Sequence, residues 1–296
     1  MKCLHCRQDN FAWARRCDHC GAVIPQTMLG SAPDDQTTAA PDPAIVRAVM
    51  PLRYCDCLKK DHQSTWTETT FHPEVQDTQA EGWKRLLELV EIAAADEREE
   101  FAPLHEMTLE ASRQVITLPS TIGKLKTVRR LILYGSFLVR IPPEIGDMEN
   151  LVEFRPYTSY RLHWFPFEIT RCAKLDESTV STQALYGNYK YRPPFPRLGT
   201  PLSSTARVDL ENLSPERYGA PVITKCSVCR TLLTQTGLHQ VWISLKVGTD
   251  VLPLLVNACS LDCVGRLPPA PSGYVSGPHT GGLSVEQPVE QPPGSW

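Results

Sequence analysis

The chain has 296 residues, of which 42% are hydrophobic, and a formal net charge of -3. This length allows two or three domains with a substantial core, and the small net charge excludes a global field that would hold the chain on a polyanion or an anionic membrane. Apolar runs such as 251–256 are too short to span a bilayer, and the first residues, MKCLHCRQDN, lack the apolar segment of a signal peptide. We therefore expect a cytoplasmic protein with no membrane partner.

Cysteine is abundant, and most of the 11 cysteines come in closely spaced pairs. In a reducing compartment such pairs are metal ligands more often than disulfides. The first four are Cys3, Cys6, Cys17 and Cys20. Two pairs ten residues apart suit the four thiolates that tetrahedral zinc prefers, and segment 1–24 resembles the small zinc-ribbon modules of chain termini. Because this segment is too short for a core, zinc would supply most of its folding energy.

The next segments change in composition. Residues 25–43 are rich in proline, alanine and small polar residues, which is typical of a linker. The mixed segment 44–77 contains Cys55 and Cys57, which could belong to a third metal site, although their spacing suits one tetrahedral ion poorly. Apolar residues then recur at three-and-four spacing and predict a helix over 78–98, within a capping segment that runs to residue 103.

Leucine-patterned segments then repeat with a period of 23 or 24 residues. The runs LPSTIGKL, IPPEIGDM and FPFEITRC begin at Leu118, Ile141 and Phe165. Each follows a segment with the pattern LxxLxLxxS or a close variant of it. Three such segments begin at Leu104, Val128 and Leu151, and a fourth begins at Leu175, after the last run. Four segments in one frame predict four structural repeats.

The frame resembles the leucine-rich repeat family, in the subclass LxxLxLxxNxLxxLPxxIGxL, over 104–198. The resemblance implies an α/β solenoid in which each unit gives a short strand to a concave side and a convex segment to the other, around one shared core. Serine or glutamine replaces the usual asparagine, which weakens the expected amide ladder, at Ser112, Ser136, Ser159 and Gln183. Pro156 and Ser178 also depart from the pattern, and the last unit is expected to act as a cap.

The outward residues of the expected strands form a candidate partner-binding surface. Three of the units contribute Arg130, Ile132, Tyr134, Glu153, Arg155, Tyr157, Glu177 and Thr179, and the first unit would add Glu106, Thr108 and Glu110. Tyrosine and arginine together are typical of interface hot spots, which favours a protein or peptide partner. A solvated strand with no partner carries similar residues.

A second cysteine set follows an irregular linker over 199–222. It consists of Cys226, Cys229, Cys259 and Cys263. Between the pairs, two apolar stretches predict a β-hairpin that turns at Gly248, Thr249 and Asp250. This order over 223–267 resembles a treble-clef zinc finger, although two prolines soon after the last cysteine limit its helix to a single turn. The proline-rich tail 268–296 is expected to be disordered.

The cysteine sets imply two zinc ions with only protein thiolates as ligands, which is the chemistry of structural zinc. Our leading hypothesis is a non-catalytic protein–protein interaction adaptor that uses the concave face of the repeats. The alternative is a nucleic-acid-binding regulator that acts through the first module, where Arg15, Arg16 and Trp13 could contact phosphates and bases. A third possibility is an enzyme that reads its substrate with the repeats.

Catalytic motifs do not support the third possibility. The sequence has no GxSxG, phosphate loop or HExxH. Cys172 could act as a nucleophile, but it holds the position of Leu125 and Met148 in the preceding units, so we expect a core residue. We expect that the chain is not an enzyme.

Overall fold

The computed structural model describes residues 58–60, 66–69, 72, 74–180, 195–198, 225–233, 237–282, 285, 286 and 288. The chain divides into two compact units, Met1–Ala48 and Val49–Trp296, and every described residue belongs to the second. The predictions for module 1–24 with its four cysteines, for both linkers and for Cys55 and Cys57 lie outside the described residues. Strands β1 (Leu58–Lys60) and β2 (Trp66–Thr69) form an antiparallel pair.

Helix α2 (Glu81–Ala95) confirms the helix predicted over 78–98. One face, with Trp83, Leu86, Leu89, Val90 and Ala93, is buried in the main core. Gly82 lies in the first turn of the helix, and its amide donates to the side chain of Gln114 at 2.7 Å. A Cβ on Gly82 would overlap the backbone of Ala111, so glycine lets the helix start lie against α3 (Leu109–Arg113).

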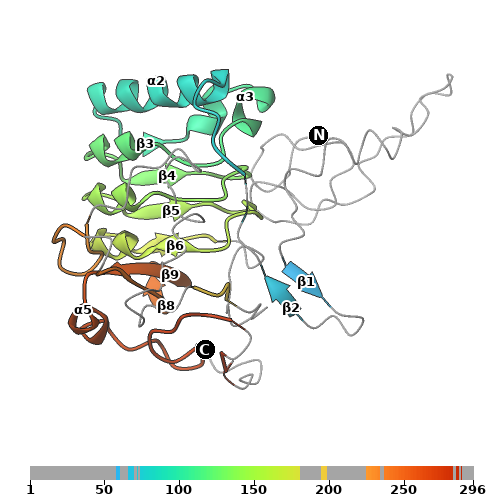
Figure 1. Cartoon of the computed structure of the whole chain (residues 1–296). Helices are drawn as coiled ribbons and strands as arrows, with labels where there is room; N and C mark the ends of the chain where they lie inside the picture. Colours follow the sequence, from blue (N-terminus) through green and yellow to red (C-terminus); the bar gives the residue numbers. More distant parts are fainter. Residues whose placement is uncertain are drawn as a thin grey trace, which may run out of the picture. The chain divides into compact units, whose positions relative to one another are not determined.

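A four-stranded parallel sheet follows α2, in the order β3 (Glu100–Phe101), β4 (Arg130–Ile132), β5 (Glu153–Arg155) and β7 (Glu177–Ser178) (Figure 1). Glu100, Arg130, Glu153 and Glu177 are register partners on successive strands. Three short 3-10 helices recur along the chain with the same spacing as β4, β5 and β7. They are η3 (Ser120–Lys124), η4 (Pro143–Asp147) and η5 (Phe167–Arg171). Their apolar residues and those of the strands, such as Ile145 and Phe154, share one core.

The first of the four units differs from its prediction. Where the pattern from Leu104 predicts a strand, the chain forms η2 (Pro103–Glu106) and α3. Thr108 caps α3 by accepting a hydrogen bond from the amide of Ala111, so Glu106, Thr108 and Glu110 do not lie on a strand. The strand that pairs with β4 lies earlier, at β3, because this unit also has to pack against α2.

Two serines occupy the position where the repeat family usually has asparagine. Ser136 and Ser159 are buried, and their hydroxyl oxygens lie 2.6 Å apart. Ser159 also donates to the carbonyl of Leu133 at 3.0 Å and accepts from the amide of Ser136. A hydroxyl pair thus satisfies backbone groups that an amide ladder would otherwise bind.

The C-terminal hairpin confirms its prediction and adds to the repeated units. Strands β8 (His239–Val247) and β9 (Asp250–Ala258) pair in antiparallel register on either side of a turn at residues 248–249. On its other edge, β9 pairs in parallel with β6 (Phe165–Pro166) of the last repeated unit. Hairpin and repeats share one hydrophobic core, so the hairpin covers the end of the repeated units (Figure 1).

Residues 268–282 correct the prediction of a disordered tail. His279 forms an antiparallel bridge with Trp242 of β8, and Val275 is buried. The amide of Leu198 donates to the carbonyl of Thr280 at 2.7 Å. Proline content suggested disorder, but an aromatic cluster around Trp242 gives this segment a surface on which to pack. Among the described residues, no helix has both the length and the apolar character needed to span a membrane.

Candidate metal centre and strand face

Cys226 and Cys229, the first pair of the C-terminal set, lie in a tight turn whose ends are joined by hydrogen bonds. The amide of Cys226 donates to the carbonyl of Thr231 at 2.8 Å, and the amide of Arg230 donates back to the carbonyl of Cys226 at 3.0 Å. Lys225 and Leu232 form a bridge at the base of this turn. Arg230 has a φ of 64°, the left-handed conformation that usually favours glycine.

The second pair lies where β9 passes into helix α5 (Leu261–Gly265). Cys259 follows β9 directly, and Ser260 caps the helix by accepting from the amide of Cys263 at 3.2 Å. Cys263 therefore occupies the first turn of α5. The helix ends at Gly265, which confirms the single turn expected before the prolines at 268 and 269.

The four thiol sulfurs converge on one point. The sulfurs of Cys226, Cys229, Cys259 and Cys263 all lie within 4.8 Å of one another. Two of the separations are 3.5 Å and 3.6 Å. Zinc bonded to four sulfurs at about 2.3 Å requires separations of about 3.8 Å, so the set can hold a metal ion after small adjustments.

Surrounding groups favour negative charge on these sulfurs. The amides of Cys229 and Cys259 each point at the sulfur of Cys226, at 3.4 Å. The guanidinium of Arg266 donates to the sulfur of Cys263 at 2.7 Å, and this hydrogen bond raises the pKa of Arg266. Such donors stabilise thiolates, the form in which cysteine binds a metal.

The thiols also influence one another. The hydrogen bond with the Thr231 hydroxyl is the main cause that lowers the pKa of Cys229 to about 6. Hydrogen bonding with Cys229 is the main cause that raises the pKa of Cys259 to about 12. A thiolate at one position thus opposes a second thiolate beside it, and a divalent cation would remove this conflict by compensating the charge of all four.

Arg230→Gly should stabilise the turn that carries Cys226 and Cys229. Glycine adopts a positive φ without the cost of about 1 kcal/mol that other residues incur there. We expect the denaturation midpoint to rise and a chelator to remove the metal more slowly. The matched control is Lys225→Gly in the same turn, which is not at a positive φ and should lose stability. Equal shifts of the denaturation midpoint in the two variants would contradict the interpretation that Arg230 strains the turn.

The predicted strand-face residues lie on neighbouring strands, but their side chains differ in solvent exposure. Arg130, Arg155, Tyr157, Glu177 and Thr179 are exposed, whereas Ile132 and Tyr134 are half-buried and Glu153 is only 7% exposed. The rings of Tyr134 and Tyr157 stack with centroids 5.8 Å apart. These residues lie on β4, β5 and β7, which are neighbours in the sheet, and on the segments that directly follow the three strands.

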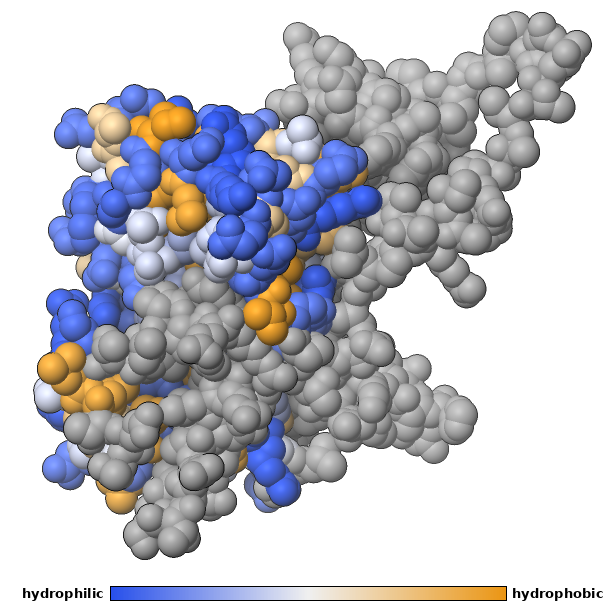
Figure 2. Space-filling model, turned by 45° about the horizontal axis from the view of Figure 1, so that its top comes forward, coloured by the Kyte–Doolittle hydropathy of each residue, from blue (hydrophilic) through white to orange (hydrophobic). Residues whose placement is uncertain are grey.

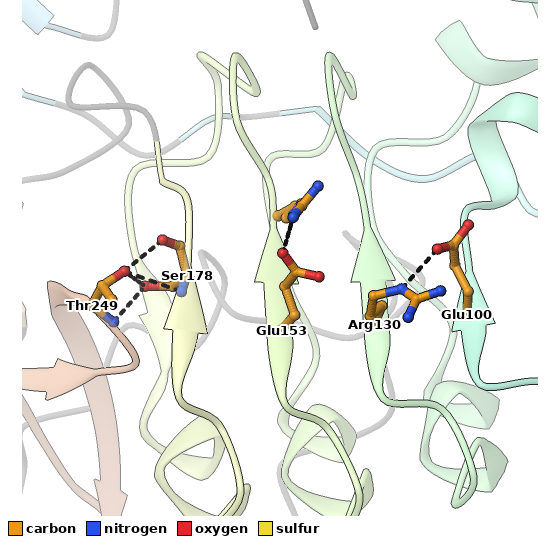
Figure 3. A network of polar contacts seen from close by, with 6 residues as sticks. Glu100, Arg130, Glu153, Ser178 and Thr249 are labelled. Atoms are coloured by element: carbon orange, nitrogen blue, oxygen red, sulfur yellow. Dashed lines mark hydrogen bonds and ion pairs between the residues drawn. The ribbon is translucent and has the colours of Figure 1, made fainter. Parts of the chain in front are cut away.

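Ion pairs fix most charges of this surface (Figure 3). Arg130 donates to Glu100 at 2.9 Å, a hydrogen bond that raises the pKa of Arg130. Glu153 pairs with Arg155 and is too buried to meet a partner as a free carboxylate. Glu177 has no ion pair with any described residue, so it is the least compensated charge on the strands.

Ser178 joins the strand face to the turn of the β8–β9 hairpin, a role that the sequence analysis missed. Its hydroxyl lies 2.7 Å from a carboxylate oxygen of Asp250. The hydroxyl of Thr249 donates to the carbonyl of Ser178 at 2.7 Å (Figure 3). Gly248 makes this contact possible, because a Cβ there would lie 2.9 Å from the carbonyl carbon of Glu177. The signal was present in the sequence as a serine at a leucine position.

Cys172 lies in the core, as its position in the repeat predicted. Leu125, Met148 and Cys172 are all buried. The thiol contacts the carbonyl of Ile145 at 3.2 Å, and burial raises its pKa to about 12. A thiol in this environment is a poor nucleophile.

A buried and a half-buried carboxyl group on the 3-10 helices also escaped the sequence analysis. Glu168 is 4% exposed, and burial raises its pKa. Its neighbour Arg171 donates to the carbonyl of Ser227 at 2.8 Å, which fastens η5 to the cysteine turn. Glu144, one unit earlier, has a pKa raised to about 7, mainly by burial.

Glu144 should make stability depend on pH. Because its pKa is raised on folding, the folded chain keeps a proton on Glu144 that the unfolded chain loses. The contribution of Glu144 to the free energy of unfolding is therefore fully present below about pH 4.5 and decreases as the pH rises to about 7. Allowing for partial exposure, we expect a loss of about 1–2 kcal/mol. Glu144→Gln should remove this part of the slope in chemical denaturation at pH 5 and pH 8, and an unchanged slope would contradict the assignment.

Comparisons with known proteins give no relative. No protein-family model matches the chain, and no curated protein or solved structure matches it significantly.

Proposed function

We propose that the chain is a non-catalytic, cytoplasmic adaptor that binds a protein or peptide on a short leucine-rich-repeat surface. Support for the repeat assignment comes from the 23- and 24-residue spacing of parallel strands and 3-10 helices around one core. The observation that carries the functional proposal is the rigid strand face. Arg130 pairs in register with Glu153 and Ile132 pairs with Arg155 on the neighbouring strands β4 and β5, and Tyr157 follows β5 by two residues, so the exposed Arg130, Arg155 and Tyr157 come from the same two units.

The turn after β5 supports a role for this face. Thr158 has a φ of 61°, and its equivalent in the preceding unit is Gly135, with a φ of 65°. The hydroxyl of Thr158 is buried and has no hydrogen-bond partner among the described residues. A β-branched residue in this conformation is strained, and such strain tends to occur beside binding sites. Thr158 directly follows Tyr157, the exposed tyrosine of the stacked pair.

We further propose that the four-cysteine centre holds structural zinc. Four thiolates are a typical zinc set, and they leave no position for a reactive water. A bound ion would fix the cysteine turn, β9 and α5 relative to one another, and thereby the cap on the repeats. If segment 1–24 binds a second ion, elemental analysis of the intact chain should find two zinc ions per chain.

Partner capture with matched variants tests the strand face. The tagged chain would be incubated with extract of its own cells, and retained proteins quantified by mass spectrometry. Arg155→Ala combined with Tyr157→Ala should remove specific partners at least about tenfold, which corresponds to 1.4 kcal/mol and is modest for two hot-spot residues.

The control carries Lys124→Ala and Lys126→Ala, which change exposed lysines near the 3-10 helices. It should retain the same proteins as the unchanged chain. Equal retention by both variants, with unchanged metal content and melting temperature, would overturn the proposal that the strand face binds the partner.

A further inference from the structure

The two cysteine segments, 225–233 and 259–267, carry the most exposed aliphatic side chains among the described residues. Leu232 is 70% exposed and Leu261 is 57% exposed. Leu232 closes the cysteine turn and Leu261 begins α5, and the Cys229 and Cys259 sulfurs that join these segments are 3.5 Å apart. Figure 2 shows a group of hydrophobic atoms at its lower left, on the side where Figure 1 places α5.

Partly buried apolar residues extend this patch. They are Val228, Leu233, Val264 and Leu267, all of which pack against the main core from the two cysteine segments. Because the core and the metal ligands hold their backbones, these side chains form a fixed surface. Exposed apolar groups on a fixed surface, rimmed by polar residues, are typical of interaction sites.

The polar residues around the patch are predominantly basic. Segments 225–233 and 259–267 contain Lys225, Arg230 and Arg266 against a single acidic residue, Asp262. Lys225 and Arg230 are exposed and form no ion pair with the described residues, while Arg266 binds the sulfur of Cys263. Arg266 offsets part of the negative charge of the four-thiolate centre, which leaves Lys225 and Arg230 as exposed basic groups that suit acidic side chains of a partner.

Arg230 gives an independent indication. It holds a left-handed conformation in which glycine would be more stable, so its side chain is present at a cost to the turn. The guanidinium is exposed and hydrogen-bonds no sulfur, unlike that of Arg266. Neither stability nor compensation of the thiolates explains the arginine, whereas contact with an acidic group of a partner does.

We propose that the metal-site rim, consisting of Lys225, Arg230, Leu232, Leu261 and Arg266, binds an acidic segment of a partner protein. Apolar side chains of that segment would cover the two leucines, and its carboxylates would pair with Lys225 and Arg230. A protein segment fits better than a nucleic acid, because the centre of the rim is aliphatic and offers no aromatic ring for base stacking. This surface is separate from the strand face.

Titration with defined probes tests this proposal. The zinc-loaded, full-length chain, labelled with ¹⁵N, would be titrated with a short synthetic peptide of aspartate and leucine. Amide signals in 225–233 and 259–267 should shift to saturation. The same peptide with serine in place of leucine should bind at least about tenfold more weakly, because the loss of two buried leucine contacts exceeds 1.4 kcal/mol.

Variants separate binding from structure. Arg230→Gly should weaken peptide binding while it stabilises the turn, so the two measurements move in opposite directions. Leu232→Ser should also weaken binding. Arg129→Gly, an exposed arginine on the repeats, and the strand-face variant Arg155→Ala with Tyr157→Ala should leave peptide binding unchanged.

Three outcomes would overturn the proposal. One is the absence of saturable shifts in the two cysteine segments. A second is binding that Arg230→Gly and Leu232→Ser do not weaken. The third is equal or tighter binding of oligothymidine at the same residues, which would make the rim a nucleic-acid surface. None of these outcomes depends on whether the strand face binds a partner.

Discussion

Cys263→Ser should abolish metal binding at the C-terminal centre and lower the free energy of unfolding by at least about 3 kcal/mol. Cys263 is buried, and its sulfur lies among the other three thiols and the guanidinium of Arg266. Serine at this position supplies a poor zinc ligand and leaves three thiolates without full compensation. Because the cysteine segments share a core with the repeats, the loss should spread beyond the module.

Elemental analysis and guanidinium denaturation measure the two effects. The matched control is Cys172→Ser, which makes the same chemical change at another buried cysteine but outside the centre. It should keep the full metal content and lose less stability, because serine can keep the hydrogen bond to Ile145. Unchanged metal content in both variants would show that the four thiols do not bind a metal.

Amide hydrogen exchange would show which parts of the chain lose stability in Cys263→Ser. In Cys263→Ser, the amides of residues 177–179 should exchange faster, because Ser178 is held by the turn of the hairpin. The amides of α2, at the other end of the repeated units, should change less. This gradient distinguishes a cap that supports its neighbours from a module that folds by itself.

Local patterns in the sequence were enough to predict several elements. The apolar spacing predicted α2, two apolar stretches with turn residues between them predicted the β8–β9 hairpin, and paired cysteines predicted the four-thiol cluster. Each of these depends on neighbours within a few residues or on ligand chemistry. The repeat spacing likewise predicted where β4, β5 and β7 begin.

Features decided by distant contacts were not predictable in this way. The first unit forms α3 because it packs against α2, and residues 268–282 are ordered because Trp242 and Phe195 offer an aromatic surface. The position of Glu153 on its strand was predicted, but its burial and its ion pair with Arg155 were not. The joint between Ser178 and Thr249 spans 71 residues of sequence and depends on how the hairpin caps the repeats.

Gly146→Ala should destabilise the protein by about 2–4 kcal/mol, because the added methyl group has no space between η4 and η5. A Cβ on Gly146 would lie 2.9 Å from the carbonyl carbon of Glu168 and closer still to its oxygen. These are backbone atoms, and η5 cannot move away easily. Arg171 ties it to the cysteine turn, and β6 just before it is paired with β9.

Gly123→Ala, at the same position one unit earlier, is the matched control. Its Cβ would meet the side chain of the exposed Asp147 and the carbonyl of Glu144 at 3.3 Å, contacts that small shifts can relieve. We expect a change of less than about 1 kcal/mol in denaturant unfolding. Gly146→Ala should also release the metal to a chelator faster, whereas Gly123→Ala should not. Similar losses in both variants would mean that the spacing of the 3-10 helices is set elsewhere, and that η5 does not connect the repeats to the metal centre.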